Sequence, residues 1–146
     1  MTRLAIGVDL GGTNLRIAAV DSNGKVLDKI TTSTQVARGR DQVIDEMCIA
    51  IQEVVGKQRG AGELAGIGIG VPGIIEMETG MLRESPNLPG WHNYPVRDEI
   101  QDRLRTTVVL ENDANAAAWA KNGWAPPPAW MTCACSPWAQ AWAEAW

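Results

Sequence analysis

The chain has 146 residues, of which 45 % are hydrophobic and 21 % are charged, and its formal net charge is −4. This length fits one compact domain and is too short for two full ones, and the acidic balance disfavours a nucleic-acid-binding protein. No apolar run reaches the roughly 20 residues of a membrane span, and no cleavable signal precedes the first strand-like run. We therefore expect a cytoplasmic protein that has neither a nucleic acid nor a membrane as its partner.

The N-terminal part of the chain predicts three consecutive strands. Residues 4–10 form an apolar run that ends at a pair of glycines, and residues 15–19 then alternate between apolar and other side chains. Residues 25–31 follow the dipeptide Asn23-Gly24, which is favoured in type I′ turns because both positions need positive φ. The sequence therefore predicts a β-meander.

Helices and strands alternate in the next segment. Asp41 is the predicted N-cap of an amphipathic helix, in which Cys48 is expected to be a small buried hydrophobe. Residues 64–71 predict a buried, glycine-rich strand, residues 96–104 a short helix and residues 106–110 another strand. The order β-β-β-α-β-α-β is typical of an α/β fold with a mixed sheet.

Residues 119–146 have a different character. Six of the seven tryptophans lie there, and no helical or strand period fits the segment. Four Trp-Ala pairs occur, and each is encoded TGG-GCN, which in the neighbouring frame reads Leu, Met or Val followed by Gly. In the neighbouring frame, the repeated pairs thus encode a glycine-rich peptide. This peptide favours a frameshift near Ala118 and Trp119 over a native Trp-rich segment. We expect residues 1–118 to form a folded lobe and residues 119–146 a non-native tail.

A glycine turn follows the first predicted strand and suggests phosphate binding. Two adjacent glycines let backbone N–H groups approach a phosphate, Thr13 adds a hydroxyl, and Asp9 can hold Mg²⁺ through water. An ordinary hairpin connection is the alternative. The predicted cofactor-binding residues are Asp9, Gly11, Gly12, Thr13 and Asn14.

Polar side chains later in the chain suggest a polyol site and a general base. The amide of Asn87 has donors and acceptors that suit a polyol, and Trp91 offers a flat apolar face. Asp113 follows an apolar strand, where a carboxylate can accept the proton of an attacking hydroxyl or simply cap a helix. His92 is expected to be a surface histidine.

Four segments together resemble the ROK family of sugar kinases, and within it the bacterial glucokinases. The family implies an actin-like, RNase H-like fold of two α/β lobes that close over ATP-Mg²⁺ and glucose, phosphoryl transfer to the sugar 6-hydroxyl, and a homo-oligomer. By position, the resemblance implies that Asp113 is the catalytic base and that Gly73, Asn87 and Asn112 contact the sugar. The matching segments are Ile6 to Asn14, Val71 to Gly73, Ser85 to Trp91 and Glu111 to Ala116.

The resemblance covers only the N-terminal lobe. The second phosphate loop, the adenosine pocket, a sugar-binding Glu and His and a Cys-rich zinc loop are expected in the second lobe, and none is present in frame. Cys133 and Cys135 lack further ligands at a usable spacing, so structural zinc is expected only in that second lobe. We therefore expect an inactive fragment of a glucokinase.

Three alternatives stay open for the function. They are a kinase of another hexose or amino sugar, a non-catalytic sugar-binding module, and a ROK transcriptional repressor. A repressor needs a DNA-binding helix-turn-helix before the first strand, where this sequence has three residues.

Overall fold

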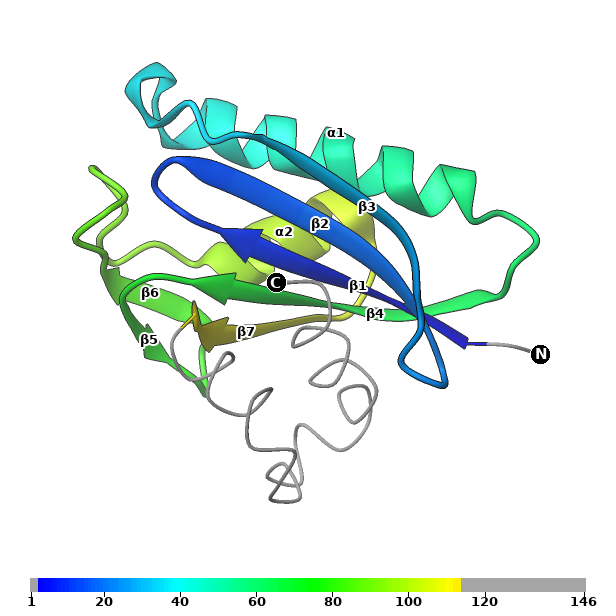
Figure 1. The fold of residues 1–146 in the computed structure, drawn as a ribbon. Helices are drawn as coiled ribbons and strands as arrows, with labels where there is room; N and C mark the ends of the chain where they lie inside the picture. The colour runs from blue at the N-terminus through cyan, green and yellow to red at the C-terminus, as the bar shows by residue number, and fades with distance from the viewer. Residues whose placement is uncertain (1–2, 114–146) are drawn as a thin grey trace.

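The structure is a computed structural model, and it describes residues 3–113. It opens with the predicted meander, formed by β1 (Arg3–Leu10), β2 (Asn14–Asp21) and β3 (Val26–Ser33), which pair antiparallel in sequence order (Figure 1). In β1 and β2, apolar side chains of alternate residues enter the core, as half-buried strands require. The predictions for residues 119–146 lie outside the described residues.

The turn between β2 and β3 is not of the predicted type. Gly24 has positive φ (83°), but Asn23 does not, so the pair does not form a type I′ turn. The amide of Gly24 donates to the carbonyl of Asp21 at 3.0 Å, and Oδ1 of Asp21 accepts from the amides of Asn23 and Lys25. The aspartate side chain therefore stabilises a one-residue-longer turn, in which only the glycine needs the left-handed conformation.

Helix α1 (Arg40–Lys57) covers one face of the sheet, after a short 3₁₀ turn at Val36–Arg38. Its N-cap is Gly39, without a side-chain hydrogen bond, so the prediction that Asp41 caps the helix is wrong. Asp41 instead lies in the first turn, where a negative charge stabilises the helix dipole. The buried face of α1 consists of Val43, Ile44, Met47, Cys48, Ile51 and Val54.

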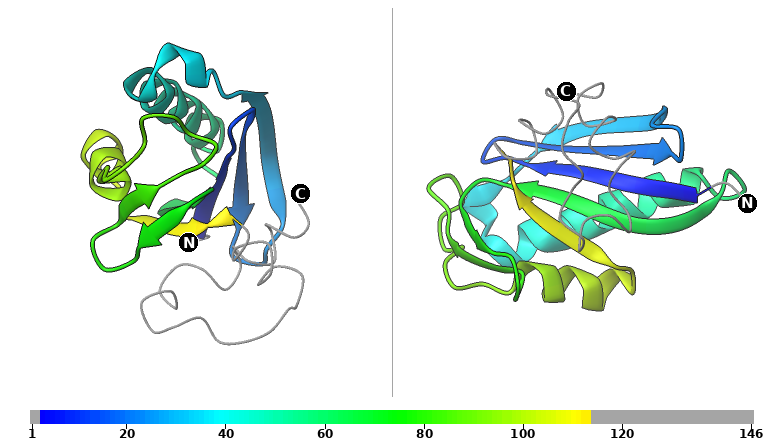
Figure 2. Two further views of the ribbon diagram at one scale, coloured as in Figure 1. Left: turned by 90° about the vertical axis from the view of Figure 1, so that its left-hand side faces the viewer. Right: turned by 90° about the horizontal axis from the view of Figure 1, so that it is seen from below.

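Two parallel strands complete the main sheet, whose order is β3-β2-β1-β4-β7. β4 (Glu63–Val71) pairs with β1, and β7 (Val108–Asn112) pairs with β4. The last strand begins two residues later than predicted, because Arg105 in the left-handed conformation (φ 52°) and the hydroxyl of Thr106 first end α2 (Val96–Leu104). Figure 2 shows that α1 and α2 pack on the same face of the sheet.

A hairpin that the sequence analysis did not predict lies between β4 and α2. It consists of β5 (Ile74–Glu76) and β6 (Met81–Glu84), which form a separate two-stranded sheet. The guanidinium of Arg97 donates to the carbonyl of Glu78 in the hairpin turn at 3.3 Å, and Leu82 forms an isolated β-bridge with Tyr94. These contacts attach the hairpin to the segment that enters α2.

The core lies between the main sheet and the two helices. Ile6, Val8 and Leu10 of β1 face the helices and are buried, whereas Gly7 and Asp9 alternate with them on the other face. Cys48 is 6 % exposed, which confirms that it behaves as a small core residue. Within residues 3–113, no helix is both long and apolar enough to cross a membrane.

Candidate functional site

The carboxyl ends of three parallel strands meet at one edge of the main sheet. β1, β4 and β7 run in the same direction, so the residues that follow each strand lie beside one another (Figure 1). In open α/β sheets this edge is where ligands bind. Every residue predicted for the site lies at this edge or in the loop after β6, and the list is Asp9, Gly11, Gly12, Thr13, Asn14, Gly73, Asn87, Asn112 and Asp113.

The glycine turn joins β1 to β2. The amide of Gly11 donates to the carbonyl of Asn14 at 2.9 Å, and the carbonyl of Thr13 accepts from the amide of Thr34 at 2.7 Å. Thr13 and Asn14 are exposed. The turn is therefore held by its own backbone and by the residue after β3, and its side chains face solvent.

Gly12 brings the turn against the loop that carries Asn87. A β-carbon at Gly12 would lie 2.8 Å from the carbonyl oxygen of Asn87, closer than real side chains approach backbone. Gly12 does not have positive φ, unlike Gly73 (φ 134°), so space rather than backbone conformation requires a glycine there. Two elements that are far apart in sequence thus touch at the site.

Gly73 and Asn112 form a second long-range connection. Nδ2 of Asn112 donates to the carbonyl of Gly73 at 2.8 Å, across the ends of β7 and β4. A β-carbon at Gly73 would lie 2.2 Å from the carbonyl oxygen of Glu84, so this glycine also lets the end of β6 pack closely. The structure therefore brings together the ends of three strands around Gly73.

Carboxylates dominate the electrostatics of the site. The side chain of Asp9 is 22 % exposed and pairs with Arg16, with Oδ2 and Nη1 3.5 Å apart. Burial raises the pKa of Asp9, the Arg16 guanidinium lowers it, and the neighbouring charge of Asp113 raises it further. Asp9 and Asp113 are therefore close enough to interact, as the prediction of one shared site requires.

The residues available for a cation are oxygen donors. In the described part of the chain, no group of three or more His, Cys, Asp or Glu side chains is arranged to hold a metal ion. Asp9, whose carboxylate feels the charge of Asp113, has the oxygen chemistry that Mg²⁺ prefers. Mg²⁺ usually keeps several waters and takes only one or two protein carboxylates. The residues present thus fit a Mg²⁺ ion that Asp9 binds through water, as proposed from the sequence.

Of the side chains predicted around the sugar site, Trp91 has surroundings other than expected. Trp91 is 2 % exposed and packs edge-on against Tyr94, with ring centroids 5.8 Å apart, so its face is not available to a ligand. His92 is exposed, as predicted. Asn87 is exposed, and its backbone carbonyl contacts Gly12. Trp91 therefore anchors the loop that presents Asn87.

Sequence reasoning missed Arg16 and Glu111. In the sheet, Arg16 pairs in register with Asp9, Asp9 with Gly70, and Gly70 with Glu111, so these residues form one row across four strands. Glu111 is 6 % exposed, and its Oε1 accepts from the amide of Asn112 at 2.7 Å. The signal that could have identified Glu111 was a charged residue directly after the predicted apolar strand, a position that β7 includes.

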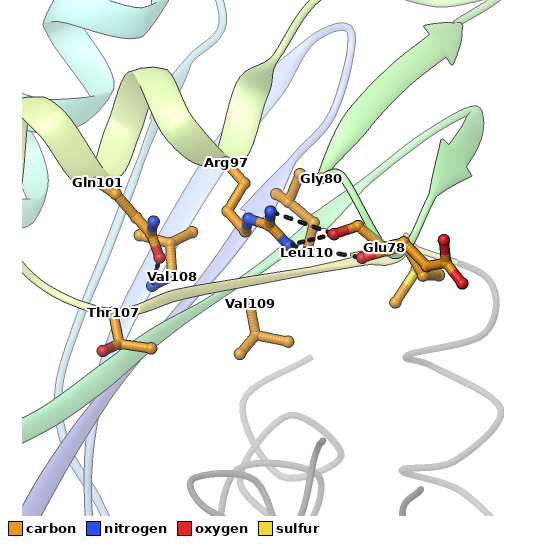
Figure 3. Close-up of a pocket in the computed structure, with 9 residues that line it drawn as sticks. Glu78, Gly80, Arg97, Gln101, Thr107, Val108, Val109 and Leu110 are labelled. Carbon is orange, nitrogen blue, oxygen red and sulfur yellow. Dashed lines mark hydrogen bonds between the residues drawn. The ribbon is translucent and has the colours of Figure 1, made fainter. Parts of the chain in front are cut away.

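A cavity of about 500 Å³ lies along the outer edge of β7, away from these residues (Figure 3). None of the predicted site residues lines it. Its polar side chains have structural contacts, because Arg97 binds the carbonyls of Met77 and Glu78 and Oε1 of Gln101 accepts from the amide of Val108 at 3.0 Å. The cavity is therefore not part of the candidate site.

Comparison with known proteins adds an independent line of evidence. A sequence model of the ROK family matches residues 5–127. A glucokinase from Thermotoga maritima is 46 % identical over 111 residues, which are 76 % of this chain and 34 % of that protein. A xylose repressor from Caldicellulosiruptor bescii is 36 % identical over 115 residues, 77 % of this chain and 28 % of the repressor.

A solved structure extends the comparison to the fold. It is a ROK family glucokinase from Streptomyces griseus in complex with glucose and AMPPNP, 34 % identical to this chain, with a TM-score of 0.69 over 81 % of this chain and 36 % of that one. The five-stranded mixed sheet is that of the actin-like N-terminal lobe of ROK sugar kinases. The chain spans about a third of the length of the curated relatives it matches.

Proposed function

Because the chain belongs to the ROK family, we propose that it provides the N-terminal half of the active site of a glucokinase, which transfers the γ-phosphoryl group of ATP to the 6-hydroxyl of glucose. One observation carries the proposal: the glycine turn after β1, Gly73 after β4 and Asp113 after β7 lie at one edge of the sheet. A phosphate-binding turn and a carboxylate base beside it are what phosphoryl transfer to a hydroxyl needs.

The glycine turn would hold the cofactor. The backbone amide of Gly12 and the hydroxyl of Thr13 can donate to phosphate oxygens. The amide of Gly11 instead closes the turn through its bond to the carbonyl of Asn14. Asp9 would bind Mg²⁺ through water, and Mg²⁺ supplies charge neutralisation at the phosphates. The partly buried Asp9 is held near the turn by Arg16, so the turn and the carboxylate keep a fixed relative position.

The other half of the site would hold the sugar. Asn87 and Asn112 offer amide donors and acceptors to hydroxyl groups, and Gly73 would contact the sugar through its backbone at the end of β4. Asp113 would accept the proton of the attacking hydroxyl and orient it toward the phosphoryl group. Asn87 and Asn112 are positioned by long-range contacts, Asn87 at Gly12 and Asn112 at Gly73.

A regulatory role is the second candidate, since the similarity to the xylose repressor covers a comparable part of the chain. A measurement of ATP-dependent sugar phosphorylation separates the kinase from the regulatory protein. We expect an ATP-dependent enzyme, and an enzyme of sugar metabolism that uses ATP would work in the cytoplasm. Glucose or a related hexose is its proposed partner, structural zinc would belong to the second lobe, and a homo-oligomer is proposed for the full-length protein.

A lobe exchange tests the function directly. Residues 3–113 would replace the matching segment of the Thermotoga maritima glucokinase, and the purified hybrid would be assayed with Mg-ATP and a panel of sugars. We expect the highest kcat/KM with glucose. A preference for N-acetylglucosamine, mannose or fructose would identify a different sugar kinase, and a folded hybrid that binds glucose without turnover would favour a sugar-binding module.

The 146-residue chain itself should show no sustained turnover. Positioning of reactants supplies roughly 7–11 kcal/mol of the lowering of a barrier, and one lobe contacts the reactants from one side. A coupled assay for glucose 6-phosphate measures this. Turnover that Asp113→Asn abolishes would contradict it, and the nucleotide sequence at the codons of Ala118 and Trp119 would test the proposed frameshift.

A further inference from the structure

We propose that Glu111 is a positioning residue, which fixes the backbone at Asn112 and thereby aims Asn112 at Gly73 and Asp113 at the acceptor hydroxyl. The functional meaning of this inference rests on the function proposed above, but the contacts themselves do not. Within residues 3–113, Glu111 and Thr34 are the only buried polar or charged residues.

The burial of Glu111 points to a specific task. Its strand neighbours Val108 and Leu110 are buried and apolar. A carboxylate removed from water destabilises a protein unless hydrogen bonds compensate for the lost solvation. An apolar residue at this position would serve stability better, so the carboxylate has a role that an apolar side chain cannot fill.

The hydrogen bonds of Glu111 show what that role is. Oε1 of Glu111 accepts from the amide of Asn112 at 2.7 Å, and Nδ2 of Asn112 donates to the carbonyl of Gly73 at 2.8 Å. The two bonds form a continuous chain from the carboxylate, through both the backbone and the side chain of Asn112, to the end of β4. A shift of the Asn112 backbone would therefore move its side chain and the adjacent Asp113.

The outer edge of β7 explains why a side chain is needed there. Because the carbonyl of Thr107 faces β4, where it accepts from Ile67, the amides of Val108 and Asn112 point to the opposite side. In the described sheet, β7 is the edge strand, so no neighbouring strand binds these amides. Gln101 binds the first of them at 3.0 Å, and Glu111 binds the second.

Gln101 and Glu111, which bind the edge amides of β7, act at opposite ends of the strand. Gln101 binds the edge at the beginning of β7, far from the site, and a neutral amide is sufficient there. Glu111 acts at the last residue of the strand, next to Asp113, where its Oε1 accepts from the amide of Asn112 at 2.7 Å. Gln101 is therefore the natural control for Glu111, because it caps the same strand without touching the site.

The test uses the 146-residue chain and no catalysis. Hydrogen exchange of the Asn112 side-chain amide, followed by NMR, reports the bond to Gly73. We expect slow exchange in the wild type and in Glu111→Gln, which keeps an acceptor oxygen at the same reach. We expect at least tenfold faster exchange in Glu111→Leu, which lacks the acceptor, and in Glu111→Asp, which keeps the charge but is one methylene shorter.

Gln101→Leu is the control variant. Gln101→Leu should lower the unfolding midpoint but leave the exchange of the Asn112 side chain unchanged. Slow exchange in both Glu111→Leu and Glu111→Asp would overturn the proposal, as would fast exchange in Glu111→Gln. If Glu111→Leu does not fold, the comparison of the Gln and Asp variants decides alone.

The lobe-exchange protein gives the functional readout separately. There, Glu111→Asp should lower kcat and raise the KM for the sugar, with roughly 100-fold loss of kcat/KM, because a displacement near 1 Å has an effect of this size. Glu111→Gln should restore most of the activity, and the KM for ATP should change little. An inactive hybrid with the expected amide exchange would reject the proposed function and keep the role of Glu111.

Discussion

The two faces of the main sheet differ in composition although the same strands form both. The face under α1 and α2 carries large apolar side chains such as Val8 and Leu110, whereas the other face carries Asp9 and Glu111 in the adjacent positions. A strand alternates its side chains between faces, so a residue for packing and a residue for chemistry can be immediate neighbours in sequence. Whether a strand residue faces the helices or the opposite side therefore indicates its role better than its location along the chain does.

Asp113→Asn should give the largest effect. In the lobe-exchange protein, kcat should fall by about 10²–10⁴ with little change in the KM for the sugar, because a positioned base acts in the transition state. Steady-state kinetics measures this, and urea unfolding should show nearly wild-type stability. Turnover close to that of the wild type would remove Asp113 from the mechanism.

The helix-facing side should respond in the opposite way. Ile69 of β4 is fully buried, and Ile69→Ala should lower the free energy of unfolding of the chain by about 2–5 kcal/mol through lost burial and a cavity. Ile49 on α1 is 64 % exposed, so Ile49→Ala should change it by less than about 0.5 kcal/mol. Equal losses from the two variants, measured by urea unfolding, would refute the assignment of the faces.

Gly12→Ala tests the contact at which the glycine turn meets the loop that carries Asn87. The added methyl group would overlap the carbonyl of Asn87, and such overpacking destabilises by about 1–3 kcal/mol. Hydrogen exchange should accelerate in the loop at residues 85–91. In Gly11→Ala, where the new β-carbon would meet only the carbonyl and amide of Asn14, exchange in that loop should not change. Identical exchange in both variants would show that the contact does not position the loop.

Asp9→Asn should have the smallest effect, which depends on pH. Burial raises the pKa of Asp9, so between the ordinary value of 3.8 and its raised value the folded chain binds more protons than the unfolded one. Stability then decreases as pH rises through this interval. Asp9→Asn should raise Tm at neutral pH by roughly 2–4 °C. Loss of the ion pair with Arg16 should reduce this gain. The gain should vanish below pH 3.8, where the carboxyl of Asp9 is protonated in both states. A variant less stable than wild type at neutral pH would show that the pair with Arg16 dominates.

Local sequence patterns were sufficient for much of the fold. The meander, the two helices and the order of these elements along the chain followed from periodicity. The candidate site loops were proposed from glycines and polar residues after apolar strands. The hairpin of β5 and β6 did not, because its strands are only three and four residues long. Its stability comes from long-range contacts such as the pairing of Leu82 with Tyr94.

Local patterns proposed residues for the candidate site, but not the contacts that connect them. The glycine at position 12 is needed for the approach of Asn87, a contact that no local pattern contains. Trp91 was expected to face a ligand and instead packs inside, because burying a large aromatic ring stabilises the lobe more than exposing it. The role of Glu111 depends on β7 being an edge strand, which requires knowledge of the sheet order.

The contact of Gly12 with Asn87 also constrains the order in which the chain folds. The meander of β1, β2 and β3 needs only short loop closures and can form early, whereas the pairing of β1 with β4, and the contact at Gly12, close much longer loops. During synthesis, the glycine turn therefore leaves the ribosome well before the loop that carries Asn87. We expect the edge of the sheet with the candidate site to be completed last, after the meander that supplies its glycine turn.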